Sequence, residues 1–190
     1  MGHSQEEKAK NHQRIVDVAA RRIRESGTDG PGVAEIMSEA GLTHGGFYKH
    51  FDSRDDLVAE AVDAAIEQGR ADLEAQVDGA EDPLAAFVDA YLSTEHRDDP
   101  GTGCAVVALG ADVARAGDRV RSTYRGQVEH YLADMEALLG GAGDEETRRR
   151  AIAAVASMVG AMLISRAIDD EALSDEILRA VRATVEAEGS

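Results

Sequence analysis

Apolar residues recur with helical spacing along nearly the whole sequence, and this periodicity limits the possible folds more than any other feature. Between residues 8 and 26, for example, Ile15, Val18, Ala19 and Ile23 share one helical face. No segment alternates apolar and polar residues as a half-buried strand does. We therefore predict an all-α fold of about nine helices, which cover residues 8–26, 33–40, 44–51, 54–77, 83–94, 104–115, 117–139, 145–168 and 174–187.

Several helix ends carry recognisable local signals. Gly41 suits the left-handed conformation that ends a helix. Thr43 and Ser53 are residue types that cap the start of a helix, and Pro83 suits a first helical turn. These signals predict helix starts near residues 44, 54 and 83.

The charge is distributed unevenly along the chain. The net charge is −17, yet residues 1–54 hold eight basic and eight acidic side chains, so all of the excess lies in the remaining 136 residues. A nucleic-acid-binding head on an acidic body has this pattern, although ordinary variation in surface charge explains it equally well.

Composition also bears on the cellular compartment. The N-terminus is polar, and the longest apolar run, residues 151–164, is short for a membrane span. A single cysteine, Cys104, cannot form an intramolecular disulfide, which is consistent with a reducing compartment. We expect a cytoplasmic protein without a membrane segment.

The stretch "GLTHGGFYKHF", residues 41–51, is the most informative in the chain. It follows a short helix and a glycine turn, so the two segments form a candidate helix-turn-helix whose second helix enters the major groove of DNA. Phe47 and Phe51 lie four residues apart and are expected to pack inward. At Gly45 and Gly46, the missing side chains would let the backbone approach DNA closely.

Residues 14–57 resemble the DNA-binding domain of the TetR/AcrR family of transcriptional regulators, through "AGLT", "FYKHF" and the Ser-Arg pair that follows. The resemblance implies base contacts or phosphate contacts by a set of residues in this segment, and a phosphate-binding arm before it. The residues are Thr43, His44, Gly45, Gly46, Tyr48, Lys49, His50 and Arg54, with Lys8, Lys10 and Arg14 in the arm. Of these, Lys49 is the best candidate for guanine recognition.

The sequence departs from the family pattern at the start of the second helix. Gly32 replaces a Ser or Thr hydroxyl, and Ala34 replaces the basic residue that some members have. Base recognition is therefore expected to depend mainly on the third helix. Tyr48 and His50 could instead stabilise the small head, and Lys49 could be a solvated lysine.

The resemblance also implies a homodimer formed by the last two helices of each subunit, which would bind a pseudo-palindromic operator in double-stranded DNA. A fully buried central helix in a monomer is the alternative. The apolar residues expected at the dimer interface are Ile152, Val155, Val159, Leu163, Ile177, Val181 and Val185.

Family members bind a small-molecule effector in the C-terminal domain, and the connecting helix 54–77 is the expected lever. Aromatic and methionine side chains make adaptable apolar cavities, although each could equally be core. The candidates are Phe87, Tyr91, Cys104, Val107, Tyr124, Tyr131, Met135, Met158 and Met162. Their chemistry favours a small, mostly apolar effector.

We therefore predict a helix-turn-helix domain over residues 1–53 and a ligand-binding and dimerisation domain over 54–190. The predicted function is a ligand-responsive repressor that releases its operator when the effector binds. Two alternatives stay open: an oxidant or electrophile sensor acting through Cys104, and a helical ligand-binding protein without DNA binding. No metal-ligand cluster, catalytic motif or phosphate loop is evident in the sequence, so neither an enzyme nor a cofactor is expected.

Overall fold

The computed structural model describes the backbone of residues 2–141 and 143–188, and the side chains in those ranges except at 2–4, 70, 72–74 and 76. The secondary structure of these residues is entirely helical, which confirms the all-α prediction. The elements are α1 (Gly2–Ser26), α2 (Val33–Glu39), the 3-10 helix η1 (His44–Lys49), α3 (Arg54–Val77), α4 (Pro83–Tyr91), α5 (Thr94–Asp98), α6 (Ala105–Val113), α7 (Asp118–Leu138), α8 (Glu145–Ala167) and α9 (Glu171–Glu188).

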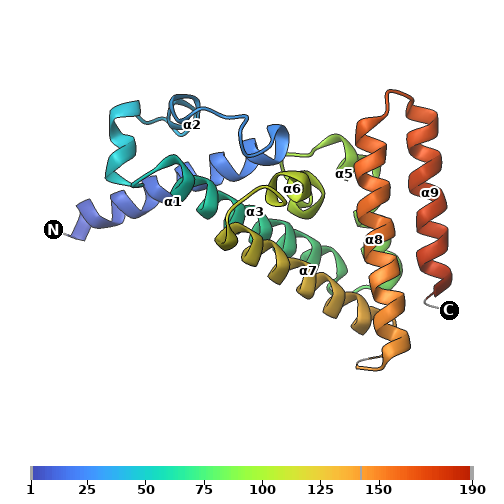
Figure 1. Ribbon diagram of the computed structural model, residues 1–190. Helices are drawn as coiled ribbons and strands as arrows, with labels where there is room; N and C mark the ends of the chain where they lie inside the picture. The colour runs from blue at the N-terminus through green and yellow to red at the C-terminus, as the bar shows by residue number, and fades with distance from the viewer. Residues whose placement is uncertain (1, 142, 189–190) are drawn as a thin grey trace.

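The helices form an elongated molecule (Figure 1). The helices α1 and α2 lie at one end, and α8 and α9 run side by side at the other end. The long helices α3 and α7 extend between the two ends, and α6 lies at the centre, in contact with α1, α3, α7 and α8. The two ends are therefore joined by packed helices.

Each end of the molecule has its own cluster of buried apolar residues. The first contains Ile15 and Ile23 of α1, Phe47 of η1 and Leu57 of α3, and it continues to Leu109 of α6. The second joins α4, α6 and α7 to α8 and α9 through residues such as Val88, Met135 and Met158. Helix α6 supplies residues to both clusters, so a shift of α6 would disturb both ends.

Most local predictions of helix ends are confirmed. Gly41 has φ +71° and ends α2, with the Leu42 N–H donating to the Met37 carbonyl at 2.8 Å. The Ser53 hydroxyl accepts from the Asp56 N–H at 3.1 Å at the start of α3. Pro83 opens α4, where Asp82 is the N-cap. These ends are set by interactions between near neighbours in the sequence.

Four local predictions are wrong. Residues 44–49 form a 3-10 helix rather than an α-helix, and the Thr43 side chain makes no capping hydrogen bond. The predicted helix 83–94 is interrupted, because the Ser93 hydroxyl accepts from the His96 N–H and starts α5. Helix α9 begins at Glu171 rather than 174, where the Asp170 carboxylate accepts from the Leu173 N–H.

Within the described residues, α8 is the one helix that is long and apolar enough to cross a membrane, by length and composition only. This is weak evidence for a membrane span, because a core helix of a soluble protein passes the same test. Helix α8 contacts α7 and α9, and it carries three consecutive arginines, Arg148, Arg149 and Arg150, near its start.

Candidate nucleic-acid interface and effector cavities

The 3-10 helix η1 is held to the head by Phe47 and by Phe51, which follows it. Phe47 and Phe51 are buried, and their rings stack with centroids 5.5 Å apart. The ring of His12 on α1 stacks on Phe51 at 4.6 Å. This anchoring fixes which side of η1 faces outward, because the aromatic side chains occupy the inward side.

The outward side of η1, with its N-cap residue, carries five of the eleven residues predicted to bind DNA. Thr43, His44, Gly45, Tyr48 and Lys49 are exposed, and Tyr48 retains 74% of its accessible surface. An exposed tyrosine beside a lysine offers an aromatic face and two kinds of hydrogen-bond donor. The arrangement is suited to a DNA surface.

No contact among the described residues requires glycine at positions 45 and 46. Neither glycine has a positive φ angle. A Cβ added at Gly45 would meet no atom within 4 Å, and one at Gly46 would lie 3.6 Å from Met37 Cε, an ordinary contact. Packing among the described residues therefore gives no reason for the glycine pair.

His50 is half-buried beside the same surface, and its Nδ1 atom is buried without a hydrogen-bond partner among the described residues. Burial lowers the pKa of His50, and the nearby His12, Lys8 and Lys49 lower it further. The neutral ring is therefore favoured near pH 7. His12, which sequence reasoning did not single out, also holds Glu60 of α3 at 2.7 Å.

Arg54 and the predicted arm are placed differently from the outward residues of η1. The Arg54 guanidinium donates to the Thr28 carbonyl at 2.6 Å, so it ties the turn after α1 to the start of α3. Lys8, Lys10 and Arg14 lie on the helix α1, with Lys10 paired to Glu6 and Arg14 bonded to Asn11. The basic arm is helical in this structure.

Two cavities lie beside α3, α4 and α7, and they differ in character. The first, which we call the polar cavity, has a volume of about 480 Å³ and is lined in part by Tyr91, Ser93, His96, Thr102, Cys104 and Tyr131. The second, the apolar cavity, has about 700 Å³ and is lined in part by Ala75, Val77, Pro83, Phe87, Tyr131 and Leu138. Ala75 and Tyr131 line both, so the two cavities are neighbours.

The structure therefore brings together four of the predicted ligand-binding residues, Phe87, Tyr91, Cys104 and Tyr131, at the two cavities. The other predicted residues lie elsewhere. Met135, Met158 and Met162 are buried in the second apolar cluster, Tyr124 donates to the Val106 carbonyl, and Val107 lines a separate surface depression near α8.

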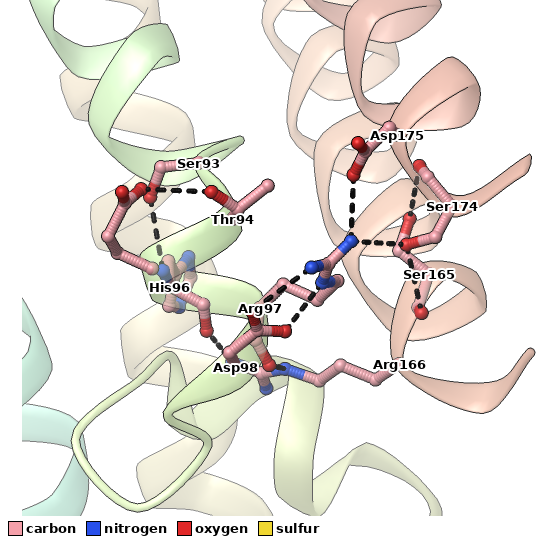
Figure 2. Close-up of polar contacts among 10 residues, drawn as sticks. Ser93, Thr94, His96, Arg97, Asp98, Ser165, Arg166, Ser174 and Asp175 are labelled. Atoms are coloured by element: carbon pink, nitrogen blue, oxygen red, sulfur yellow. Dashed lines mark hydrogen bonds and ion pairs between the residues drawn. The ribbon is translucent and has the colours of Figure 1, made fainter. Parts of the chain in front are cut away.

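A polar network joins α5 to the last two helices (Figure 2). Arg97 donates to Ser174 at 3.0 Å and to Asp175 at 2.8 Å, and Arg166 donates to the carbonyls of His96 and Arg97. His96 in turn connects the network to the polar cavity, because its Nε2 accepts the Cys104 N–H at 2.9 Å. Sequence reasoning missed these residues, since their partners are distant in the chain.

Another long-range contact connects the loop after α5 with the head. Arg24 of α1 is buried and donates to the carbonyl of Gly101 at 2.6 Å and to that of Ala65 at 2.9 Å. Gly101 lies in the loop between α5 and α6. The segment from His96 to Cys104 therefore contacts the head, the polar cavity and α9.

The predicted dimer residues fall into three groups by exposure. Ile152 and Leu163 of α8 are exposed, together with Ile164, at 47%, 53% and 49%. Val185 is buried inside the chain. The others, Val155, Val159, Ile177 and Val181, are partly buried against the second cluster.

Comparison with known proteins finds a family match over the head. Residues 15–61 match the model of bacterial regulatory proteins, tetR family. An HTH-type transcriptional regulator of Mycobacterium tuberculosis is 28% identical over 182 residues, covering 90% of this chain and 91% of the relative. The regulator AcrR of Shigella flexneri is 32% identical over 85 residues, covering 44% of this chain and 40% of AcrR.

Solved structures share the fold. A TetR transcriptional regulator from Chloroflexus aurantiacus superposes with a TM-score of 0.80 at 22% identity, covering 95% of this chain and 96% of the other. The match therefore extends over nearly the whole chain and not only over the head.

Proposed function

Since this chain is a TetR-family transcriptional regulator with an N-terminal DNA-binding domain, we propose that it is a repressor that binds a pseudo-palindromic operator as a homodimer and is released by a small-molecule effector. The observation that carries the proposal is the outward surface of η1. It combines an exposed Tyr48 and Lys49 with a glycine pair for which internal packing gives no reason.

The DNA contacts we assign follow from this surface. Thr43, His44, Tyr48 and Lys49 provide donors to phosphates or base edges, and Gly45 with Gly46 lets the backbone come close. His50 and Arg54 stand beside them, and Lys8, Lys10 and Arg14 extend the basic surface along α1. The start of α2 adds little, because the N-cap Gly32 has no side chain to donate.

We propose that residues 1–53 bind DNA and that residues 54–190 bind the effector and form the dimer. Exposed Ile152 and Leu163 lie on one face of α8 with the partly buried Val155 and Val159, and they support dimerisation, because an apolar strip of this kind on a helix is normally covered by a partner. A homodimer would present two heads to the two half-sites of an operator. Such a protein acts in the cytoplasm, where the DNA lies.

Effector binding is supported by the polar and apolar cavities. The segment from His96 to Cys104 borders the polar cavity and also holds Gly101, to which Arg24 donates. An effector that moves this segment would alter the position of α1, so the segment acts as a lever together with α3. The effector must bind the DNA-free conformation better, typically by about 1–3 kcal/mol.

The proposal is tested by measuring binding of the purified protein to the DNA upstream of its own gene. Fluorescence anisotropy over a series of salt concentrations should give an affinity that falls steeply as salt rises, since basic side chains displace counterions. No binding even at low salt would favour the alternative, a helical ligand-binding protein without DNA binding.

Sensing through Cys104 is the second candidate function, and one observation favours it. The thiol is buried at the N-cap of α6, 3.5 Å from the Tyr131 hydroxyl, and it lines the polar cavity. Small oxidants could reach it through that cavity. If Cys104→Ser leaves oxidant-dependent release of DNA unchanged, this candidate function is excluded.

A further inference from the structure

The Tyr91 hydroxyl is the most unusual polar group near the cavities. Tyr91 retains only 5% of its accessible surface, and its hydroxyl has no hydrogen-bond partner in the described part of the chain. Buried polar groups are nearly always paired, because an unpaired one keeps its desolvation cost. Tyr91 lines the polar cavity, and although the hydroxyl oxygen itself is covered, a small rotation of the side chain would bring it to a ligand in that cavity.

The other polar groups inside the polar cavity are uncharged. His96 accepts the Cys104 N–H through Nε2, while its Nδ1 lies 2.6 Å from the Tyr91 carbonyl and donates to it, so the ring is neutral. Burial lowers the pKa of His96 and raises that of Tyr91 and Tyr131. Tyr131 and Cys104 pair with each other at 3.5 Å.

Charged groups surround the cavities in a way that disfavours a charged ligand. Among the described lining residues, the charged side chains are carboxylates: Glu95 and Asp99 at the polar cavity, and Asp78 and Asp134 at the apolar one. They repel an anion. Arg166 lies behind the polar cavity, and its guanidinium donates to the His96 and Arg97 carbonyls. A ligand with a cationic head would place that charge near Arg166, and the carboxylates that line the cavities are exposed rather than buried beside it.

The apolar cavity continues from the polar one past Tyr131 and is bordered by Phe87, Val77 and Leu138. It offers hydrophobic surface at a distance from the hydrogen-bonding end. We propose that the two cavities form one elongated effector site, which takes an uncharged amphiphile whose hydrogen-bonding head meets the Tyr91 hydroxyl and whose hydrocarbon tail lies against Phe87 and Leu138. This inference rests on the proposed effector binding and specifies its chemistry.

The test uses calorimetry on the full chain without DNA, with probes that share a tail and differ in head charge. The probes are 1-octanol, octanoate and octylammonium, and 1-butanol shortens the tail. We expect 1-octanol to bind at least about tenfold tighter than either charged probe, since burying an unpaired charge is costly. Each methylene should contribute about fourfold, so 1-butanol should bind about 200-fold more weakly.

Two variants locate the two ends of the probe. Tyr91→Phe should weaken 1-octanol binding by about two- to tenfold, the usual value of one hydrogen bond. It should not lower the melting temperature of the free protein, because the lost hydroxyl has no internal partner. Leu138→Gln should weaken 1-octanol binding but not 1-butanol binding. The matched control is Tyr124→Phe, which removes a hydroxyl outside both cavities and should leave 1-octanol binding unchanged.

Several results would overturn the inference: equal or tighter binding of a charged probe, no binding of any probe at millimolar concentration, or unchanged 1-octanol affinity in Tyr91→Phe. Operator release is measured separately, by anisotropy with labelled DNA. If 1-octanol binds as expected but DNA stays bound, the site stands and effector-driven release is wrong. If the protein binds DNA but none of the probes, the site is wrong and DNA binding stands.

Discussion

Substitutions at Gly45 test the DNA interface, because we expect a small side chain there to raise the stability of the protein and a large one to lower its affinity for DNA. Its backbone is outside the positive-φ region, and an added Cβ meets nothing within 4 Å. Replacing such a glycine with alanine typically stabilises a protein by about 0.4–1 kcal/mol, because the unfolded chain loses freedom. For a chain of this size, Gly45→Ala should therefore raise the melting temperature by about 1–4 °C.

DNA affinity should change in the other direction. If the backbone at Gly45 lies against DNA, a leucine side chain there must displace η1 from the groove. Loss of a single base-pair contact costs about 1–3 kcal/mol, and a homodimer carries the substitution in both heads. Gly45→Leu should therefore cost about 2–6 kcal/mol of binding free energy, which is at least about thirtyfold in affinity.

The assay combines thermal unfolding followed by circular dichroism with anisotropy on labelled upstream DNA at fixed salt. Gly126→Ala on α7 is the matched control, because an added Cβ there also meets nothing within 4 Å and the site is far from η1 in the sequence. It should gain stability and leave DNA affinity unchanged. Close approach at Gly45 is refuted if Gly45→Leu is folded and binds within about threefold of the unsubstituted protein.

Three further predictions concern the interface, the dimer and the coupling between domains. Lys49→Met should weaken operator binding by about 1–3 kcal/mol if Lys49 contacts a base. If Lys49 contacts a phosphate instead, the substitution should lower the slope of log affinity against log salt concentration by about one. Fluorescence anisotropy measures both quantities. Leu163→Asp places a carboxylate on the exposed strip of α8 and should convert dimers to monomers in light scattering; an unchanged mass would reject that strip as the interface. Arg24→Met removes the donors to Gly101 and Ala65, and should lower the free energy of unfolding by about 2–4 kcal/mol in urea titrations while reducing effector-driven release; unchanged release would contradict the coupling.

The fold could be predicted from the sequence to the extent that short-range interactions determine it. The left-handed Gly41 and the Ser53 cap depend on residues within four positions, and both are present in the structure. The inward placement of Phe47 and Phe51 follows from their spacing. The break at Ser93 was missed because the apolar pattern continues through it, although Ser93 is itself a residue type that caps helices.

The cavities could be predicted only in part. Tyr91, Cys104 and Tyr131 come from different segments and meet through tertiary packing, which a single sequence does not encode in any local pattern. Met135 and Met158 have the same helical spacing and apolar character as the lining residues, yet they are buried in the core. Whether an inward side chain meets another helix or a cavity depends on how the helices diverge, and periodicity carries no information on that divergence.

The contact from Arg24 to Gly101 leads to a stricter test of the proposed regulation, because coupling between two binding sites is reciprocal. If an effector lowers DNA affinity by some factor, DNA must lower effector affinity by the same factor. Arg24→Met must then reduce both factors equally, since it removes the contact and touches neither ligand. A variant in which effector binding still responds fully to DNA, while DNA binding no longer responds to effector, would break this cycle. The observed loss would then reflect damage to the head rather than a lost connection through the segment from His96 to Cys104.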